Sequence, residues 1–216
     1  MVCQMEVTSH LLSGVAFGSV AETSKVVLAA RLAEQTPAQS LTIMDKGFYA
    51  LDLLHHWQIS GMEKHWMIPL RKGAQYRVKE RASPGHEMVE LSLTPQARKK
   101  WSGALATLTA RLLSKEVSGR TVQILTSMCD LLRYLRANIM DLYGHRCEIE
   151  HGFRKMKQHL LNNELTLGSK KPELVRQELW GVALAYNLLR FMMAQMAYNI
   201  KIQSLISWDL NRRRCI

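Results

Sequence analysis

The stretch that decides the fold reads Leu142-Tyr-Gly-His-Arg-Cys-Glu-Ile-Glu-His-Gly-Phe-Arg-Lys-Met-Lys157. Within it, Tyr143, Arg146, Glu150 and Lys157 follow one another at steps of three, four and seven residues. At about 3.6 residues per turn, these steps predict a helix with all four side chains within about 60° of one face. A carboxylate held among two cations and a phenol suits metal-assisted chemistry on a phosphate group.

The same helix has a second interpretation. Glu150 has Arg146 and Arg154 one turn away on either side, so the charges can form a solvated ladder worth a few tenths of a kcal/mol. On helix pattern alone that ladder is the commoner arrangement. An apolar stripe beside the charges is expected to pack on a core, and it comprises Leu142, Ile149, Phe153, Met156 and Leu160.

The spacing Tyr-x2-Arg-x3-Glu-x6-Lys favours the functional interpretation. With average residue usage, a chance match in a chain of this length is on the order of one in a thousand. The chain resembles the insertion-sequence-four (IS-four) family of DDE transposases, for which this spacing is the signature. The resemblance implies an α/β fold with a ribonuclease H-like catalytic core, and metal-dependent DNA strand cleavage and transfer in cut-and-paste transposition.

A second part of the resemblance lies in Ser40-Leu-Thr-Ile-Met-Asp45-Lys-Gly-Phe-Tyr49. The apolar run, the Lys-Gly pair and the apolar periodicity that follows predict a strand, a turn and a helix. An Asp at the carboxyl end of a buried strand faces the crevice where open α/β sheets bind ligands. The resemblance makes Asp45 the second of three metal-binding carboxylates, whereas local sequence alone favours a helix N-cap.

Residue by residue, the resemblance assigns five positions. Asp45 and Glu150 become catalytic ligands of paired Mg²⁺ or Mn²⁺ ions. Tyr143, Arg146 and Lys157 are expected to hold the phosphates at the cleaved transposon end, and guanidinium, ammonium and phenol groups suit that task. One departure stands between the signature Arg and Glu, where the family usually has Trp and this chain has Cys147.

The first family carboxylate has no counterpart here. Asp45 is the first aspartate of the chain, and only Glu6, Glu22 and Glu34 precede it. We therefore expect the first strand and its Asp to lie upstream of Met1. We also expect the irregular basic end to mark a truncation of the family domain at its carboxyl end. A chain without that Asp is expected to cleave little DNA by itself. An unrelated metal-dependent nuclease using Glu6, Asp45 and Glu150 is an alternative.

Charge is distributed unevenly along the chain. The net charge is +11, with 29 Lys and Arg against 18 Asp and Glu. Residues 1–60 hold three of these cations and five of the acids, so they carry −2 and the remainder carries +13. A basic excess of this size attracts polyanions by counterion release, although a solubilising surface has the same composition.

Four segments are expected along the chain. They are the first part of the core over 1–62, an antiparallel β insertion over 63–128, a helical part with the signature over 129–200, and an irregular tail over 201–216. The first is expected to hold strands over 2–7, 10–17 and 40–45 and helices over 21–35 and 48–59. A long helix is expected after Pro172, with a buried stripe of Leu174, Val175, Leu179, Val182, Tyr186 and Leu189.

The expected partner is double-stranded DNA at transposon ends, with a homodimer or an association with an intact transposase. The apolar segment 179–200 is interrupted by polar residues and predicts a core helix, not a membrane span. A cytoplasmic, nucleoid-associated protein is therefore expected. A DNA-binding regulator that inhibits an intact transposase is the alternative function.

Overall fold

The computed structural model describes residues 1–19, 21–93, 95, 107–117, 119–147, 152, 154 and 168–199. These residues form two compact units. The first comprises Met1–Val2 and Gly18–Gly144, and the second comprises Cys3–Phe17 and the described residues from His145 onward. Each unit is described by itself below.

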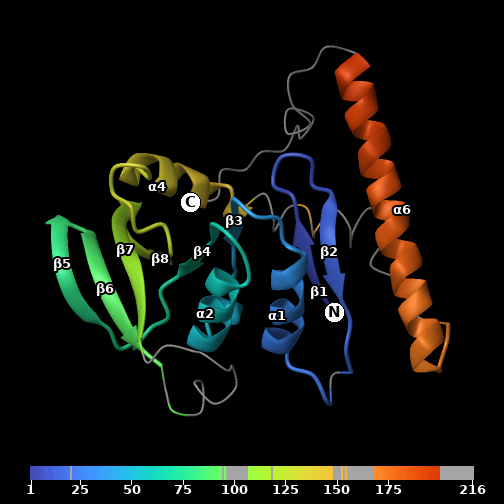
Figure 1. The fold of residues 1–216 in the computed structure, drawn as a ribbon. Helices are drawn as coiled ribbons and strands as arrows, with labels where there is room; N and C mark the ends of the chain where they lie inside the picture. Colours follow the sequence, from blue (N-terminus) through green and yellow to red (C-terminus); the bar gives the residue numbers. More distant parts are fainter. Residues whose placement is uncertain are drawn as a thin grey trace. The chain divides into compact units, whose positions relative to one another are not determined.

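The first unit is organised around a six-stranded sheet with the order β3-β4-β8-β7-β6-β5 (Figure 1). The strands β3 and β4 are parallel, and the other neighbours are antiparallel. The strands span Ser40–Ile43 (β3), Lys64–Pro69 (β4), Arg77–Ser83 (β5), His86–Ser92 (β6), Thr107–Val117 (β7) and Arg120–Thr126 (β8). A parallel pair needs a crossover connection, and the chain between β3 and β4 supplies it as a helix.

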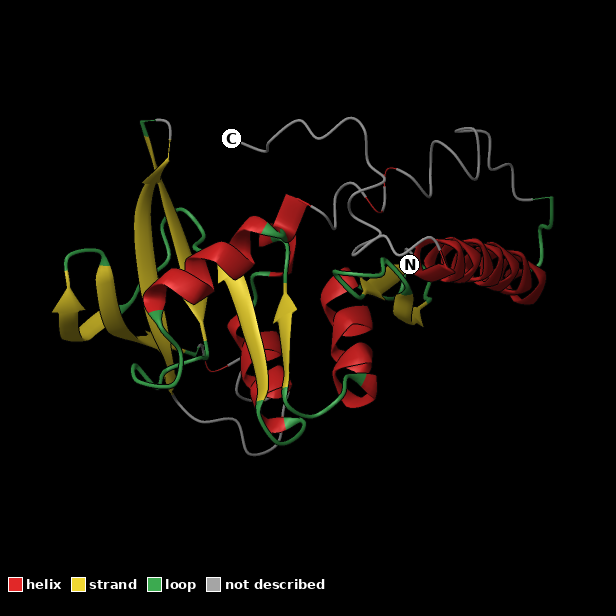
Figure 2. Cartoon of the chain, turned by 90° about the horizontal axis from the view of Figure 1, so that it is seen from above, coloured by secondary structure: helices red, strands yellow, loops and turns green. Residues whose placement is uncertain are grey.

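One helix precedes β3 in the chain, a 3-10 turn and a second helix form the crossover to β4, and polar contacts hold their ends. They are α1 (Lys25–Gln35), the 3-10 turn η1 (Lys46–Phe48) and α2 (Leu51–Ile59), drawn in red in Figure 2. Ser24 caps α1 by accepting a hydrogen bond from the amide of Val27. The buried ammonium of Lys64 donates to the carbonyls of Ala33 (2.7 Å) and Ser60 (3.4 Å), where the negative ends of α1 and α2 favour a cation.

The core of the first unit lies on the central strands. The side chains with no exposed surface include Trp66, Met67, Ile68, Leu113, Ile124 and Leu125, from β4, β7 and β8. Because each of these strands has a hydrogen-bonded neighbour on both sides, its backbone groups are paired within the sheet. These strands form the rigid part on which the loops of this unit are built.

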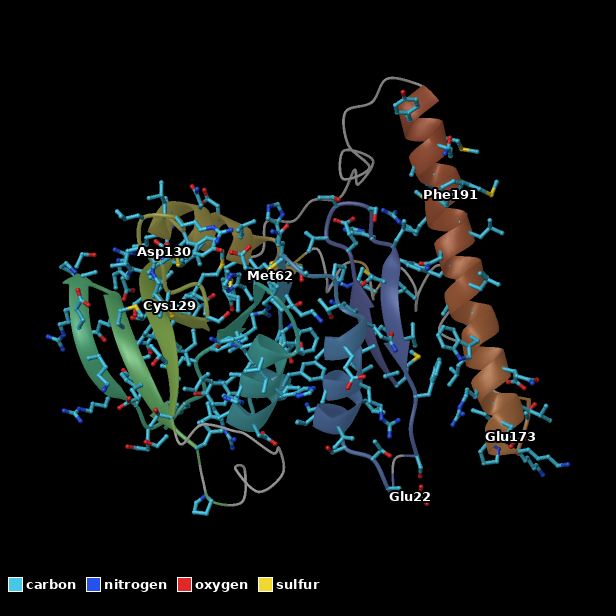
Figure 3. The ribbon with its side chains drawn as sticks, in the orientation of Figure 1. Glu22, Met62, Cys129, Asp130, Glu173 and Phe191 are labelled. Carbon is cyan, nitrogen blue, oxygen red and sulfur yellow. The ribbon has the colours of Figure 1, made fainter. Side chains whose placement is uncertain are left out.

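A short helix, α4 (Arg136–Gly144), follows β8 after a connecting segment that contains Cys129 and Asp130 (Figure 3). Ile139 is its buried residue, and it belongs to a cluster with Met67, Leu113 and Ile124. The helix α4 therefore packs on the core of the six-stranded sheet.

The second unit combines a two-stranded sheet with a long helix. The strands are β1 (Val2–Met5) and β2 (Leu12–Ala16), and the helix is α6 (Pro172–Asn199). Met5 and Leu12 pack against Ala183 and Tyr186 of α6. The side chain of Asn187 accepts from the amide of Leu12 (2.8 Å) and donates to its carbonyl (3.0 Å).

Most expected elements are confirmed, with shifted bounds. The strand expected over 40–45 ends at Ile43, and the helix expected over 48–59 begins at Leu51 after η1. The helix expected over 21–35 begins at Lys25, because Ser24 supplies its cap. The strand expected over 65–70 spans Lys64–Pro69, and it pairs in parallel with β3, so the expectation of a purely antiparallel insertion is wrong at this strand. The six-stranded sheet includes both the core strands and those expected for the insertion.

Two expected apolar stripes are wrong in part. In α6, Tyr186 is buried as expected, but Leu174 and Leu189 are exposed, whereas Arg190 is buried. The partner of this face is a β hairpin that offers backbone carbonyls, so polar side chains replace apolar ones. In α4, Leu142 is also exposed, and the buried contact comes from Ile139.

Within the part of the chain that the structure describes, no helix is long and apolar enough to cross a membrane.

Candidate functional site

Asp45 lies at the carboxyl end of β3, where the chain leaves the sheet. The amide of buried Met44 still donates to the carbonyl of Met67 on β4 (2.8 Å), and the next residue, Asp45, is exposed. Its Oδ2 accepts from the amide of Gly47 (3.1 Å), so Asp45 caps η1. Asp45 therefore both follows the end of β3 and caps a helical turn, as the two interpretations of its sequence expected.

The ammonium group of Lys25 lies beside the Asp45 turn. The Nζ of Lys25, on α1, lies 5.6 Å from the centre of the Phe48 ring. A Cβ added to Gly47 would collide with this Nζ and would lie 3.2 Å from Oδ2 of Asp45. The ammonium and the carboxylate thus both lie against Gly47, and a side chain at this position would displace the lysine.

A cavity of about 460 Å³ opens beside the same turn and is lined by Lys46, Gly47, Tyr49 and Arg71. The hydroxyl oxygen of Tyr49 is buried and has no hydrogen-bond partner among the described residues. Burial raises the pKa of Tyr49, and the charge of Arg71 opposes that rise. The phenol is therefore protonated at neutral pH and is available as a donor.

The signature region is interrupted within the described residues. The helix α4 ends at Gly144, His145 forms a turn, and Arg146 and Cys147 are helical again. The expectation of one continuous helix from Leu142 is therefore wrong at this point. Glycine favours the unfolded chain over a helix by about 1 kcal/mol relative to alanine, so Gly144 is a suitable place for the helix to end.

The described signature residues have different surroundings. Tyr143 is half-buried and packs against the cluster around Ile139 in the first unit, while Arg146 is half-buried and belongs to the second unit. Glu150 and Lys157 lie outside the described residues. The roles of Asp45, Glu150, Tyr143, Arg146 and Lys157 therefore stay predictions.

Glu6, the alternative carboxylate, has a local structural role. The strand expected over 2–7 ends at Met5, so Glu6 lies in the turn between β1 and β2. Its oxygens accept from the amide (3.0 Å) and hydroxyl (2.6 Å) of Thr8 and from the amide of Ser9 (2.5 Å). Burial alone would raise the pKa of Glu6, but these hydrogen bonds lower it to about 2.

A buried polar network positions the segment between β8 and α4. Arg111, with 1% of its surface exposed, donates through Nε to His86 Nε2 (2.6 Å) and through Nη1 to the carbonyl of Tyr134 (2.5 Å). His65 contacts the hydroxyls of Ser127 (3.2 Å) and Tyr134 (3.1 Å). Sequence reasoning missed these residues, and an arginine in an otherwise apolar strand was the available signal.

The histidines of this network are neutral. Burial lowers the pKa of His86, and the charges of Arg111 and Arg136 lower it further. Burial also lowers the pKa of His65. Because the Arg111 guanidinium donates to Nε2 of His86, that nitrogen must act as an acceptor, which agrees with the lowered pKa. Arg111 thus holds the segment between β8 and α4 at Tyr134, and its own contact with His86 requires a neutral histidine.

The residues present give a partial fit to a metal site. The exposed Asp45 carboxylate, whose Oδ2 accepts a hydrogen bond from the amide of Gly47, offers the oxygen ligands that Mg²⁺ prefers. Among the described residues, no three His, Cys, Asp or Glu side chains gather into a metal-binding group. The second expected ligand, Glu150, is outside that set.

Comparison with known proteins identifies the relatives of this chain. A protein-family model described as "Transposase DDE domain" matches residues 1–188. The transposase InsG for insertion sequence element IS4, from Escherichia coli strain K12, is 53% identical over 201 residues. The match covers 93% of this chain and 45% of that relative, so the chain spans under half the relative's length. No solved structure matches.

Proposed function

Because this chain belongs to the DDE transposase family, we propose that it binds the ends of a transposable DNA element and holds part of the metal-dependent cleavage site of a ribonuclease H-like core. The observation that carries the proposal is Asp45, exposed at the end of the parallel strand β3 within the matched region. That is the edge of an α/β sheet where ligands bind.

Asp45 and Glu150 are proposed to hold the divalent cations, Mg²⁺ or Mn²⁺. When bound, such a pair of cations stabilises the attacking and the leaving oxygen of the phosphate. The chain's own residues orient the DNA. Arg146 and Lys157 supply charges for the phosphates, and Tyr143 supplies a hydroxyl.

We further propose that these 216 residues bind DNA more effectively than they cleave it. No aspartate precedes Asp45 in this sequence, so the family's set of three carboxylates is represented by two. Asp45 and Glu150 alone would give the cations fewer carboxylate ligands than the family's set of three, so we expect slow cleavage while the basic DNA-binding side chains remain.

DNA binding is tested with a labelled duplex that carries the terminal repeats of an insertion element, titrated at several salt concentrations. The affinity is expected to fall steeply as salt rises, and Arg146→Gln should reduce the slope by about one counterion. Arg176→Gln, on the exposed side of α6, is the matched control and should change the slope no more than a generic surface charge does. Absence of binding at low salt would contradict the proposal.

Cleavage is tested on the same duplex in Mg²⁺ and Mn²⁺. We expect weak nicking at most, and Asp45→Asn should remove it, whereas Asp141→Asn on the exposed surface of α4 should not. Nicking that persists unchanged in Asp45→Asn would eliminate Asp45 as a metal ligand.

An inhibitory role follows as a second candidate from the same two-carboxylate set. A chain that occupies transposon ends without cutting them would compete with an intact transposase for the DNA, or would join it in a mixed complex. Adding the chain to an intact transposase reaction should then lower its rate, and Arg146→Gln should restore part of it. An unchanged rate at saturating chain would exclude this role.

A further inference from the structure

The cavity beside the Asp45 turn is lined by cationic and hydrogen-bonding groups. Lys46 and Arg71 place two cations on its wall, Gly47 exposes backbone, and Tyr49 adds a phenol. No carboxylate is among the described residues that line the cavity, so none of these residues neutralises either cation. A concave surface with two positive charges and no negative one attracts an anion.

The Tyr49 hydroxyl gives the cavity a second polar feature. A buried hydroxyl usually has a hydrogen-bond partner, and leaving one unpaired costs about 1–3 kcal/mol. The Tyr49 oxygen has no partner among the described residues, although its side chain belongs to the cavity lining. An acceptor in the cavity would satisfy this donor once the Tyr49 side chain turns its covered hydroxyl toward the cavity.

Lys25 extends the positive charge beyond the cavity wall. Its Nζ lies against Gly47, a lining residue, on the side where Asp45 is hydrogen-bonded to the Gly47 amide. Gly47 has no side chain to block this approach. A ligand in the cavity would therefore lie near the Asp45 carboxylate, with cations from α1, η1 and the segment after β4 close by.

We propose that this cavity binds one phosphate group of a DNA strand, adjacent to the phosphate that lies at Asp45, with Tyr49 donating a neutral hydrogen bond and Lys46 and Arg71 supplying charge. Arginine forks onto phosphate oxygens, lysine contributes a point charge, and a phenol adds a directional donor. The inference rests on the proposed function, because it names further residues that hold the same DNA.

The competing explanation is that the Tyr49 hydroxyl is merely unpaired and has no ligand. The two explanations differ in what Tyr49→Phe does. If the hydroxyl has no ligand, its removal leaves binding unchanged and stabilises the fold, since an unsatisfied buried group is lost. If it donates to phosphate, the same variant folds at least as well but binds more weakly.

The test uses the full chain, Tyr49→Phe and the control Tyr76→Phe, which removes a hydroxyl from an exposed tyrosine of the same unit. Thermal unfolding is followed in sodium phosphate and in sodium chloride at equal ionic strength. Binding of the terminal-repeat duplex is followed by fluorescence anisotropy. Phosphate should raise the Tm of the wild type and of Tyr76→Phe, because a ligand that binds only the native state stabilises it. In Tyr49→Phe most of that rise should be lost.

For the duplex, Tyr49→Phe should weaken binding about tenfold, the loss expected when one hydrogen bond to a charged group is removed. Arg71→Gln should reduce the salt dependence of duplex binding by about one counterion. Arg120→Gln, exposed at the start of β8, should leave the effect of phosphate on the Tm unchanged. Together these changes identify a phosphate site that includes both the phenol and the guanidinium.

Three results would overturn the inference. If the duplex binds the wild type, Tyr49→Phe and Tyr76→Phe equally, DNA binding stands and the cavity is not part of it. If phosphate raises the Tm of all three equally, the anion acts elsewhere. If phosphate acts selectively but the wild type binds no duplex, the cavity is a free-anion site, and the DNA assignment fails together with the proposed function.

Discussion

The two units of this chain are stabilised in different ways. In the first, the central side chains of β4, β7 and β8, such as Met67, Leu113 and Ile124, have no exposed surface, and the sheet pairs the backbones of these strands on both sides. In the second, the described buried cluster comprises Met5, Leu12, Ala183 and Tyr186, and much of the large apolar surface of α6 is exposed. Burial dominates the first unit, whereas a small set of polar contacts defines the second.

The difference shows where the chain can support precise chemistry. Asp45 and its neighbouring cavity lie at the edge of the well-packed sheet, so their geometry is fixed by strands. In the second unit, Asn187 and Arg190 hold the hairpin through backbone atoms of Leu12 and Ser9. Such contacts specify position, but each is worth only about 1 kcal/mol in net stability.

The largest contrast is expected from removing a core leucine. Leu113→Ala deletes a fully buried side chain of β7 and should destabilise the first unit by about 2–5 kcal/mol, because lost burial and a cavity add together. Leu132→Ala, at a residue 93% exposed in the same unit, is the control and should change the free energy of unfolding by less than about 0.5 kcal/mol. Urea denaturation measures both, and equal effects would contradict the assigned core.

A smaller loss is expected from Asn187→Ala in the second unit. Both hydrogen bonds to the Leu12 backbone disappear, and the unpaired amide and carbonyl cost about 1–3 kcal/mol. Hydrogen exchange of the Leu12 amide should accelerate while the amides of β7 stay protected. Gln177→Ala, exposed on the same helix, is the matched control. Unchanged exchange at Leu12 would mean that the hairpin is held by other contacts.

These contrasts explain what the sequence predicted well and what it missed. Alternating residues predicted the strands, and the run before Asp45 predicted the strand that ends beside it. The expectation that this strand is buried is wrong, because β3 is an edge strand of the sheet and its residues are half-buried. The surface of α6 was missed because a stripe of Leu174 and Leu189 assumes an apolar partner, whereas the hairpin offers carbonyls. The buried Arg111 was missed since its partners, His86 and Tyr134, come together only through strand pairing.

Acid is expected to weaken the first unit before it affects the Glu6 turn. The folded-state pKa values of His65 and His86 are lowered from 6.5, chiefly by burial, so the unfolded chain binds more protons as the pH falls below about 6.5. Stability from these groups is therefore lost on acidification. Glu6 contributes stability because hydrogen bonds to its ionised carboxylate lower its folded-state pKa from 4.5 to about 2. This contribution is complete above about pH 4.5 and is lost as the pH falls toward 2.

Thermal unfolding between about pH 7.5 and pH 5 measures this effect. His86→Gln keeps an acceptor for Arg111 but cannot take up a proton, so it should flatten the dependence in that range. Glu6→Gln should leave the dependence nearly unchanged there, because Glu6 is ionised in the folded protein and mostly ionised in the unfolded chain. A wild-type Tm that does not fall on acidification would contradict the neutral, buried state of the histidines.

The smallest effect is expected at Leu188, and it probes the exposed face of α6 directly. Leu188 is 59% exposed, so Leu188→Gln should change the free energy of unfolding by less than about 0.5 kcal/mol. Tyr186→Ala, two residues earlier and on the buried face, should cost several times more, since this side chain is 3% exposed and packs on Met5 and Leu12. A loss above about 1 kcal/mol at Leu188, growing with protein concentration, would mean that another copy covers this face. The second unit would then bury the exposed apolar side chains of α6 by association with another copy. The weaker burial of the second unit would be a property of the isolated chain alone.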